Sequence, residues 1–322
     1  MSTTTFAAPP YNGAGSATNI RVWVQAIHDA LTALGFVQTT DTGQIDLATV
    51  ITPETSHTKA GYEIWRFTDV LQSTAPIFFR IDYGTAGVTT PQMWVTVGTG
   101  SNGAGAISGV LIPESRTGGN SSGSSTVAGV GYASSGDGSM LALFPFVDFA
   151  SSAPLAAVPG FIIDRSRDAS GQPTADGVIV AVRGTTTTPV SLTTTATPSE
   201  LPTLTAAAYA TGGADVGAIP VLLPYRLNGV VLAGGNGFGA GILAPVFPWT
   251  CYAPGVAPWQ ALAAVSFAGA DDPGGLFSVF IAGQERTFRS IPITPMQCAW
   301  GLALNPAANQ ASTYVGVAIL WE

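Results

Sequence analysis

Two neighbouring segments of the chain place large apolar side chains at every second position. In the first segment these are Ile77, Phe79, Ile81 and Tyr83, and in the second they are Met93, Val95 and Val97. A period of two residues puts alternate side chains on opposite faces of a β-strand. Pro76 and Pro91 stand just before the segments, where a missing N–H group costs little. The sequence therefore predicts two half-buried strands, and the fold must cover one face of the sheet that they form.

A helical pattern precedes these strands. Its apolar positions are Ile20, Val24, Ile27, Leu31 and Leu34. Intervals of four and three residues place them on one face of an α-helix. Thr18 or Asn19 is expected to cap the helix, and Gly35 to end it in the left-handed conformation. His28 falls on the opposite face, where we expect it to be solvated. We expect this amphipathic helix to pack on an antiparallel sheet.

Composition suggests how the rest of the chain is organised. Residues 1–17 form an N-terminal arm of Thr, Ala, Pro and Gly without periodicity, and 18–112 are expected to form an α+β domain. A Gly/Ser-rich tract, 113–138, reads as a loop or linker. Residues 139–322 are expected to form a β-rich, sandwich-like half, crossed by a Thr/Pro/Ala-rich tract at 185–217. The predicted fold class is α+β, predominantly β.

The second half of the chain is rich in strand signals. Candidate strands span residues 141–149, 160–167, 177–183, 221–231, 276–281, 291–295, 298–304 and 314–321. Two of these, 160–167 and 177–183, flank a polar turn that contains Gly171 and Pro173. Two strand-like runs separated by such a turn predict a β-hairpin.

Charged residues are scarce. They make up 9% of the 322 residues, against roughly 25% in soluble globular domains. Residues 227–270 hold no charged side chain at all. Such a surface is either covered by partner subunits or coated with hydroxyl and amide groups, because bare uncharged surface promotes association. Within the uncharged run we predict Phe247, Trp249 and Trp259 as interface residues, since aromatic side chains are enriched in subunit interfaces.

Charge and hydropathy also exclude several classes of partner. The net charge of −8 and the scattered arginines argue against nucleic-acid binding, which needs clustered basic residues. The first residues lack the basic and apolar regions of a secretory signal, and no membrane span is expected. Cys251 and Cys298 are expected to be free thiols made in a reducing compartment, with a disulfide between them as the alternative.

One glycine-rich motif resembles a nucleotide-binding signature. The stretch from Gly98 to Gly103 matches G-x-G-x-x-G and follows a predicted strand. A dinucleotide site also needs a helix directly after the motif, because the helix N-terminus holds the pyrophosphate. The next residues, Ala-Gly-Ala-Ile-Ser-Gly, begin a helix poorly. The sequence therefore argues against a nucleotide site, and we predict no cofactor.

Candidate catalytic and metal-binding groups are few. Two histidines, His28 and His57, and two distant cysteines are too few for a zinc site. Asp164, Asp168 and Asp176 could face one another across the predicted hairpin. A calcium site formed by these acids is therefore the alternative to having no metal site. No evident pair of catalytic carboxylates occurs. We predict a protein that is not an enzyme and that needs no metal.

Three segments together resemble a group of virion structural proteins of tailed bacteriophages. They are EIWRFTDVLQSTAPIFFRIDYG at 63–84, PQMWVTVGTGSNGAG at 91–105 and GFIIDRSRDASGQPTADGVIVA at 160–181. The resemblance is one of strands and turns, so it carries over no active residues. It implies a place in the virion, in the tail, baseplate, collar or fibre, after synthesis in the cytoplasm of the host bacterium.

The sequence thus favours a non-enzymatic structural subunit that acts by oligomeric assembly. Its expected partners are further copies of itself and other virion structural proteins. The alternative is a receptor- or carbohydrate-binding phage adhesin or lectin whose partner is a host surface glycan. That alternative requires exposed aromatic faces for sugar rings, and Trp249 and Trp259 are the candidates.

Overall fold

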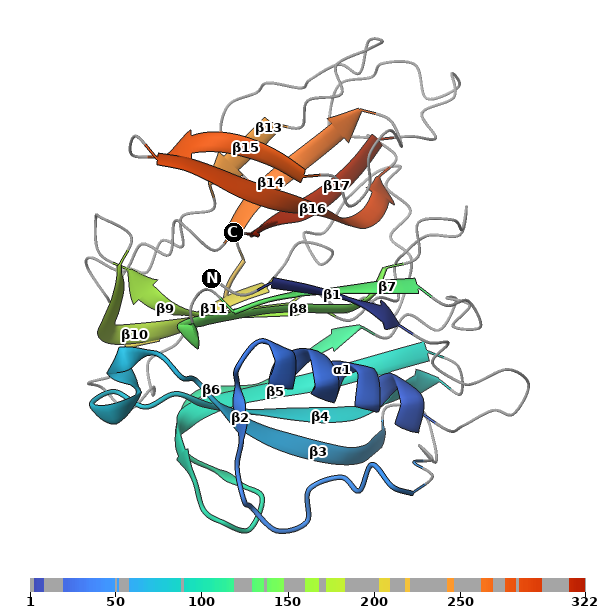
Figure 1. The fold of residues 1–322 in the computed structure, drawn as a ribbon, viewed down its shortest axis with the longest axis vertical. Coiled ribbons are helices and arrows are strands. Elements are labelled where there is room, and N and C mark those ends of the chain that lie inside the picture. The colour runs from blue at the N-terminus through green and yellow to red at the C-terminus, as the bar shows by residue number, and fades with distance from the viewer. Residues whose placement is uncertain are drawn as a thin grey trace.

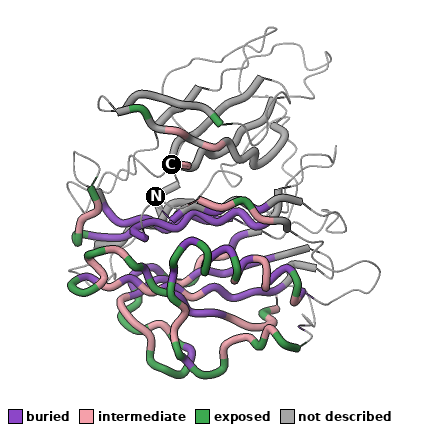
Figure 2. Tube along the Cα trace, in the orientation of Figure 1, coloured by how far each residue is buried: buried purple, intermediate pink, exposed green. Residues whose placement is uncertain are grey.

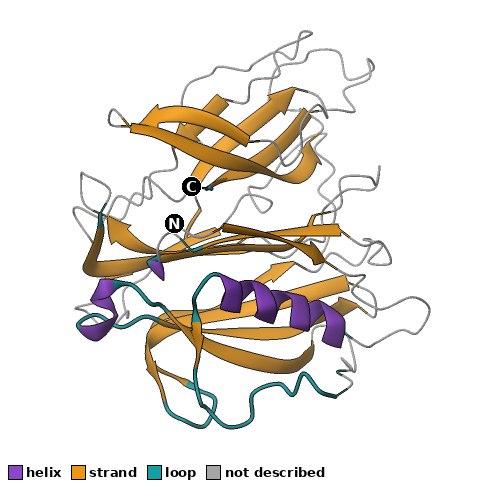
Figure 3. Ribbon diagram, in the orientation of Figure 1, coloured by secondary structure: helices purple, strands orange, loops and turns teal. Residues whose placement is uncertain are grey.

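The protein is predominantly β, as predicted. The computed structural model describes residues 3–8, 20–49, 51, 58–87, 90–118, 129–135, 138–147, 160–167, 172–182, 203–208, 218–220, 242–245, 262–268, 276–281, 284–296 and 313–321. Within these residues, strands β1–β17 form three antiparallel sheets, and α1 is the single α-helix (Figures 1 and 3).

The first sheet contains the two segments in which large apolar residues alternate. Its strands are β2 (Val37–Gln38), β3 (Thr58–Arg66), β4 (Phe78–Gly87), β5 (Thr90–Ser101) and β6 (Ile107–Gly118), in that order. The predicted strands at 77–83 and 93–97 correspond to β4 and β5 and are confirmed. Phe79, Ile81 and Tyr83 stand opposite Val97, Val95 and Met93, and all six are fully buried.

The second sheet brings together segments that are distant in sequence. Its strands, in spatial order, are β1 (Thr3–Ala8), β7 (Gly129–Ser134), β8 (Met140–Val147), β9 (Phe161–Arg167), β10 (Pro173–Val182), β11 (Thr203–Ala208) and β12 (Ala218–Pro220). The predicted hairpin is confirmed, because β9 and β10 pair antiparallel with Ile163 opposite Val180.

Three expected irregular segments contain strands. Thr3–Ala8, within the predicted arm 1–17, is β1 and pairs antiparallel with β7. Residues 113–118 belong to β6 and 129–134 form β7, so the loop predicted at 113–138 is shorter than its composition suggested. The tract at 185–217 contributes β11. Backbone pairing with a neighbouring strand explains these differences, since a ladder of N–H and C=O groups needs no apolar period of its own.

The third sheet lies near the C-terminus. Its strands, in spatial order, are β13 (Ile242–Pro245), β14 (Leu262–Ala268), β17 (Thr313–Leu320), β16 (Gln284–Met296) and β15 (Leu276–Ile281). The predicted strands at 276–281, 291–295 and 314–321 fall in β15, β16 and β17. The candidates at 221–231 and 298–304 lie outside the described residues, as do both cysteines.

Helix α1 (Arg21–Ala33) confirms the predicted amphipathic helix. Its buried residues are Trp23, Val24, Ile27, Ala30 and Leu31. Gly35 follows its C-terminus with φ of 85°, the predicted left-handed conformation. Ile20 occupies the N-cap position without a side-chain hydrogen bond, whereas Thr18 and Asn19 lie outside the described residues.

One apolar cluster joins α1 with strands of the first two sheets. It includes residues of β3–β6 and of β7–β10, so both sides of the predicted loop at 113–138 contribute to it (Figure 2). The division into domains at 18–112 and 139–322 stays a prediction.

A buried arginine adds a polar contact between these two sheets. Arg165 on β9 is 0% exposed and donates two hydrogen bonds to Asp69 and one to the carbonyl oxygen of Ala75. Asp69 also accepts a hydrogen bond from the backbone N–H of Leu71, which caps the 3₁₀ helix η1 (Val70–Ser73). A buried guanidinium is stable only where such partners satisfy it. The connection between β3 and β4 is therefore fixed to the second sheet.

Candidate functional site

The most unusual polar side chain on the apolar face of the first sheet is that of Glu63. Glu63 stands on β3 opposite Ile81, and Trp65 stands opposite Phe79 two positions later. Because side chains alternate along a strand, Glu63 and Trp65 point to the same side of the sheet. Glu63 is 0% exposed. An ionised carboxylate at such a position is tolerated only when charged or polar groups satisfy it.

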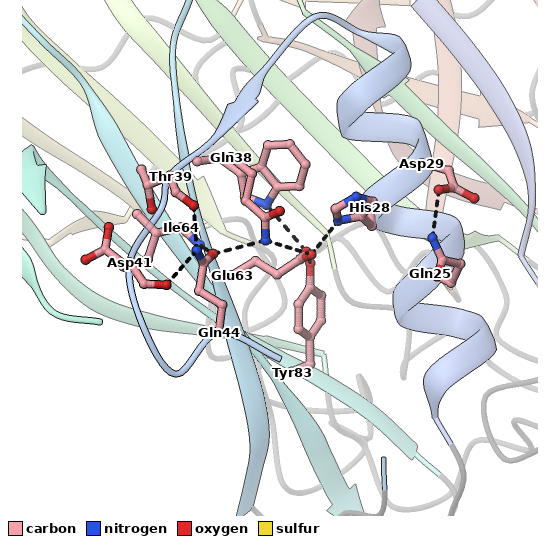
Figure 4. Close-up of polar contacts among 11 residues, drawn as sticks. Gln25, His28, Asp29, Gln38, Thr39, Asp41, Gln44, Glu63, Ile64 and Tyr83 are labelled. Atoms are coloured by element: carbon pink, nitrogen blue, oxygen red, sulfur yellow. Dashed lines mark hydrogen bonds and ion pairs between the residues drawn. The ribbon is translucent and has the colours of Figure 1, made fainter. Parts of the chain in front are cut away.

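Four side chains surround the Glu63 carboxylate (Figure 4). His28 Nδ1 lies 2.6 Å from Oε1, and the Tyr83 hydroxyl donates to Oε2 at 2.6 Å. The Trp65 indole N–H and the Gln38 amide complete the set, at 3.4 Å from Oε2 and Oε1 respectively. Each of these four groups donates a hydrogen bond to the carboxylate. An ionised carboxylate can accept such bonds on both of its oxygens. Both oxygens of the buried Glu63 carboxylate therefore have partners within the protein.

His28 does not lie on a solvated face of α1, and that prediction is wrong. Its side chain is 23% exposed, and its ring centroid lies 5.1 Å from that of Trp65. The hydrogen bond to Glu63 raises the pKa of His28; burial opposes this effect, and the negative charges of Glu63 and Asp29 add to it. His28 directly follows the buried Ile27, so it borders the apolar stripe. This position beside the apolar stripe is the sequence signal that His28 is partly buried.

Tyr83 supplies the second short contact to Glu63. Tyr83 is fully buried, and its ring meets that of Trp23 edge to face at 6.0 Å. Burial, followed by the charge and hydrogen bond of Glu63 and the charge of Asp82, raises the pKa of Tyr83 well above its ordinary value. Tyr83 is therefore a neutral hydrogen-bond donor throughout the physiological range of pH.

A pair of glutamines extends the cluster to the loop after β2. Gln38 donates to Gln44 at 3.1 Å as well as to Glu63. Gln44 in turn donates to the backbone oxygens of Thr39 and Asp41 and accepts from the N–H of Ile64 at 2.8 Å (Figure 4). These bonds fix the loop from Thr39 to Gln44 against β3.

Asp41 ties the same loop to the turn between β5 and β6. Its carboxylate accepts hydrogen bonds from the Ser101 hydroxyl at 2.7 Å and from the N–H of Gly105 at 3.2 Å. Burial would raise the pKa of Asp41, but hydrogen bonds from Thr39, Ser101 and the backbone near Gly105 outweigh burial and lower it. Asp41 is therefore satisfied as an anion by donors of its own chain.

Charged side chains gather on the opposite face of the first sheet. Arg80 donates to both carboxylate oxygens of Asp82, and its guanidinium lies 3.9 Å from the centre of the Tyr62 ring. Lys59, the only lysine of the chain, is paired with Glu114 and lies 3.6 Å from Asp82. These residues neutralise one another, as expected of charges that flank a half-buried sheet face.

The glycine-rich motif of the sequence spans the end of β5 and the start of the loop that follows it. Gly98 and Gly100 lie in β5, and β6 begins at Ile107, so a strand follows the motif. Asn102 accepts hydrogen bonds from the N–H groups of Ala104 and Ala106, which closes the turn. The helix N-terminus that a dinucleotide site requires does not follow the motif, because the next element is strand β6.

Two of the three acids considered for calcium lie within the described residues. Asp164 is 1% exposed whereas Asp176 is exposed, and Asp168 lies outside the described part of the chain. Arg165, which follows Asp164 in the sequence, pairs with Asp69. In the described ranges, no group of three or more His, Cys, Asp or Glu side chains is placed to hold a metal ion.

The described tryptophans of the first half are core residues. Trp23 and Trp65 are each 1% exposed and Trp94 is 6% exposed. None of these three offers an open ring face to a ligand. The predicted interface residues Phe247, Trp249 and Trp259 lie outside the described residues.

The cluster around Glu63 is suited to holding charge and not to transforming a substrate. Glu63 and Tyr83 have no exposed surface, so a substrate cannot reach either group. His28 alone of the three is partly exposed and can exchange a proton with solvent. The chemistry that this geometry supports is reversible protonation of His28 beside a fixed anion. Sequence reasoning missed Glu63 because an acid in an apolar strand gives no local sign of its partners.

Comparisons of the chain with protein-family models, with curated proteins and with solved structures find no match. Within the described ranges, none of the helices has the length and apolar character needed to cross a membrane.

Proposed function

We propose that the chain is a non-enzymatic structural subunit of a tailed-phage virion, which acts by oligomeric assembly in the tail, baseplate, collar or fibre. The observation that carries the proposal is the scarcity of charge: 9% of residues, and none between 227 and 270. Permanent interfaces bury large areas and are depleted of charge. Several such interfaces per subunit account for the composition. The resemblance of residues 63–84, 91–105 and 160–181 to virion proteins supports the location.

The proposal includes an architecture for the subunit. Helix α1 packs on the antiparallel sheet β2–β6, which the five buried residues of α1 and the contact between His28 and Glu63 support. The C-terminal half is sandwich-like, formed by the sheets β7–β12 and β13–β17, and the layered arrangement drawn in Figure 1 favours this.

The edge of the second sheet supports contact between copies. Strand β1 is the last strand of that sheet, and Thr3–Ala8 contains no charged residue and no proline. Proteins usually block exposed strand edges with charge or proline, because an open ladder pairs with other chains. At the other end of the sheet, β12 is short and ends at Pro220. No strand among the described residues pairs with the outer edge of β1, which suits a subunit whose partners are copies of itself or other virion proteins.

The adhesin or lectin alternative draws less support. Sugar-binding sites use aromatic rings with one open face, and Trp23, Trp65 and Trp94 are buried. That alternative therefore depends on Trp249 and Trp259. Binding of the full-length protein to members of a glycan array, lost on Trp249→Ala, would establish it in place of the structural role.

Charge introduced into the uncharged run tests the assembly proposal. We expect wild-type protein to sediment as a discrete multimer and the Trp259→Lys variant to dissociate, because a lysine is costly in an apolar interface. Val70→Lys is the matched control, since Val70 is 88% exposed on η1 and already faces solvent. Sedimentation velocity measures both. A wild-type protein that is monomeric, or a Trp259→Lys multimer as stable as the Val70→Lys multimer, would contradict the proposal.

A further inference from the structure

An ion pair links helix α1 to β3, and its two side chains differ in solvent exposure. Glu63 is 0% exposed on β3, whereas the His28 side chain on α1 is 23% exposed. The His28 Nδ1 to Glu63 Oε1 distance of 2.6 Å is that of a charge-assisted hydrogen bond. The proton that makes His28 cationic therefore exchanges with solvent, while the anion that it neutralises is sealed inside the protein.

We propose that His28 and Glu63 form a pH-sensitive latch that holds α1 on the first sheet, and that α1 opens locally more often once His28 loses its proton. This regulatory role does not depend on the virion assignment. It follows from the position of one titratable group on the helix and one buried anion on the strand.

The groups that face His28 all favour its cationic form or are neutral. Glu63 approaches from β3 and Asp29 is the next residue on α1 itself. From β4, Tyr83 binds the same carboxylate as a neutral donor. From β2, Gln38 contributes an uncharged amide. When His28 becomes neutral, the carboxylate keeps neutral donors but loses the only cationic group among the four that bind it.

The direction of the pH effect follows from linkage. The pKa of His28 in the folded protein is raised above 6.5, chiefly by the hydrogen bond to Glu63. The folded state therefore binds the proton more tightly than the open state does. The stabilisation is complete below pH 6.5 and is lost as pH rises through the pKa of folded His28. Ionisation of Tyr83 adds a further loss only above pH 10.

The apolar contacts of α1 limit how far it opens. Trp23, Val24, Ile27 and Leu31 are each 0–1% exposed, and their burial does not depend on pH. Loss of the latch therefore changes the frequency of a local opening, and the sheets stay folded. Regions of this kind appear in hydrogen exchange as segments with lower protection than the rest of the core.

Hydrogen exchange of the full-length protein against pH tests the latch. After correction for the intrinsic pH dependence of exchange, the opening constant of α1 peptides should rise by up to about tenfold per pH unit between pH 6.5 and the pKa of folded His28. Peptides of β8 and β9 should show no such rise. His28→Gln keeps an amide donor near Glu63 without a titrating charge, so its profile should be flat over this range.

The second histidine of the chain provides the matched control. His57→Gln should keep the wild-type profile of α1, and it leaves His28 as the only imidazole. The imidazole resonance of His57→Gln then reports the pKa of His28 directly by NMR, even if His28→Gln fails to fold. A pKa at or below 6.5, or an α1 profile unaffected by His28→Gln, would overturn the proposal.

Discussion

Replacing His28 with alanine would leave the Glu63 carboxylate buried with only neutral donors. Removal of one partner from a fully buried ion pair costs about 3–5 kcal/mol. His28 is 23% exposed, so water enters its place and reduces the cost. A charge-assisted hydrogen bond contributes about 1.5–3 kcal/mol. We therefore expect the free energy of unfolding of His28→Ala to fall by about 2 kcal/mol at pH 6.

Urea unfolding followed by tryptophan fluorescence measures this change, because Trp23 and Trp65 lie next to the cluster. Gln25→Ala is the matched control on the same helix. It removes an exposed hydrogen bond to Asp29 and should change stability by less than about 0.5 kcal/mol. Equal effects of His28→Ala and Gln25→Ala would refute the reasoning. Adding Glu63→Gln to His28→Ala should recover part of the loss, because a buried amide needs no ionic partner.

Three further predictions concern stability. Asp69→Ala should cost about 3–5 kcal/mol in urea unfolding, because it leaves the buried Arg165 guanidinium without its carboxylate; no loss would mean that the pair adds nothing. Gly84→Ala should lower Tm more than Gly103→Ala. A Cβ atom at Gly84 would lie 2.0 Å from a backbone oxygen, whereas a Cβ atom at Gly103 would have open space around it. A larger fall in Tm for Gly103→Ala would contradict this packing of the backbone around Gly84. The pKa of Asp41 is lowered from 3.8, so the stabilisation by Asp41 is present above pH 3.8 and is lost as pH falls through the pKa of the folded state. Asp41→Asn should therefore flatten the acid side of a plot of the urea-unfolding midpoint against pH. An unchanged acid side would contradict a stabilising role of the Asp41 carboxylate.

Local periodicity predicted the elements whose signals lie within a few residues. The apolar stripe from Ile20 to Leu34 and the glycine after it predicted α1 and its end. The alternation around Phe79 and Val95 predicted β4 and β5 and their buried face. In each case the side-chain pattern and the final environment agree, because one face of each element meets a single apolar cluster.

Long-range pairing decided what the sequence could not predict. β1 has no period of its own and is ordered by its ladder with β7, more than a hundred residues away. Glu63 looks like an exposed strand acid until Tyr83 and His28, from two other elements, are placed around it. Arg165 is paired with Asp69, which lies 96 residues away in the connection between β3 and β4. Such contacts join residues whose proximity only the fold establishes.

The native mass of the purified full-length protein, measured by light scattering over a range of concentrations, tests the central claim of assembly most directly. We expect a discrete multimer of fixed mass, since 9% charged residues protect a free monomer poorly against association. A stable monomer at every concentration would contradict the account, and would mean that hydroxyl and amide groups cover the uncharged surface.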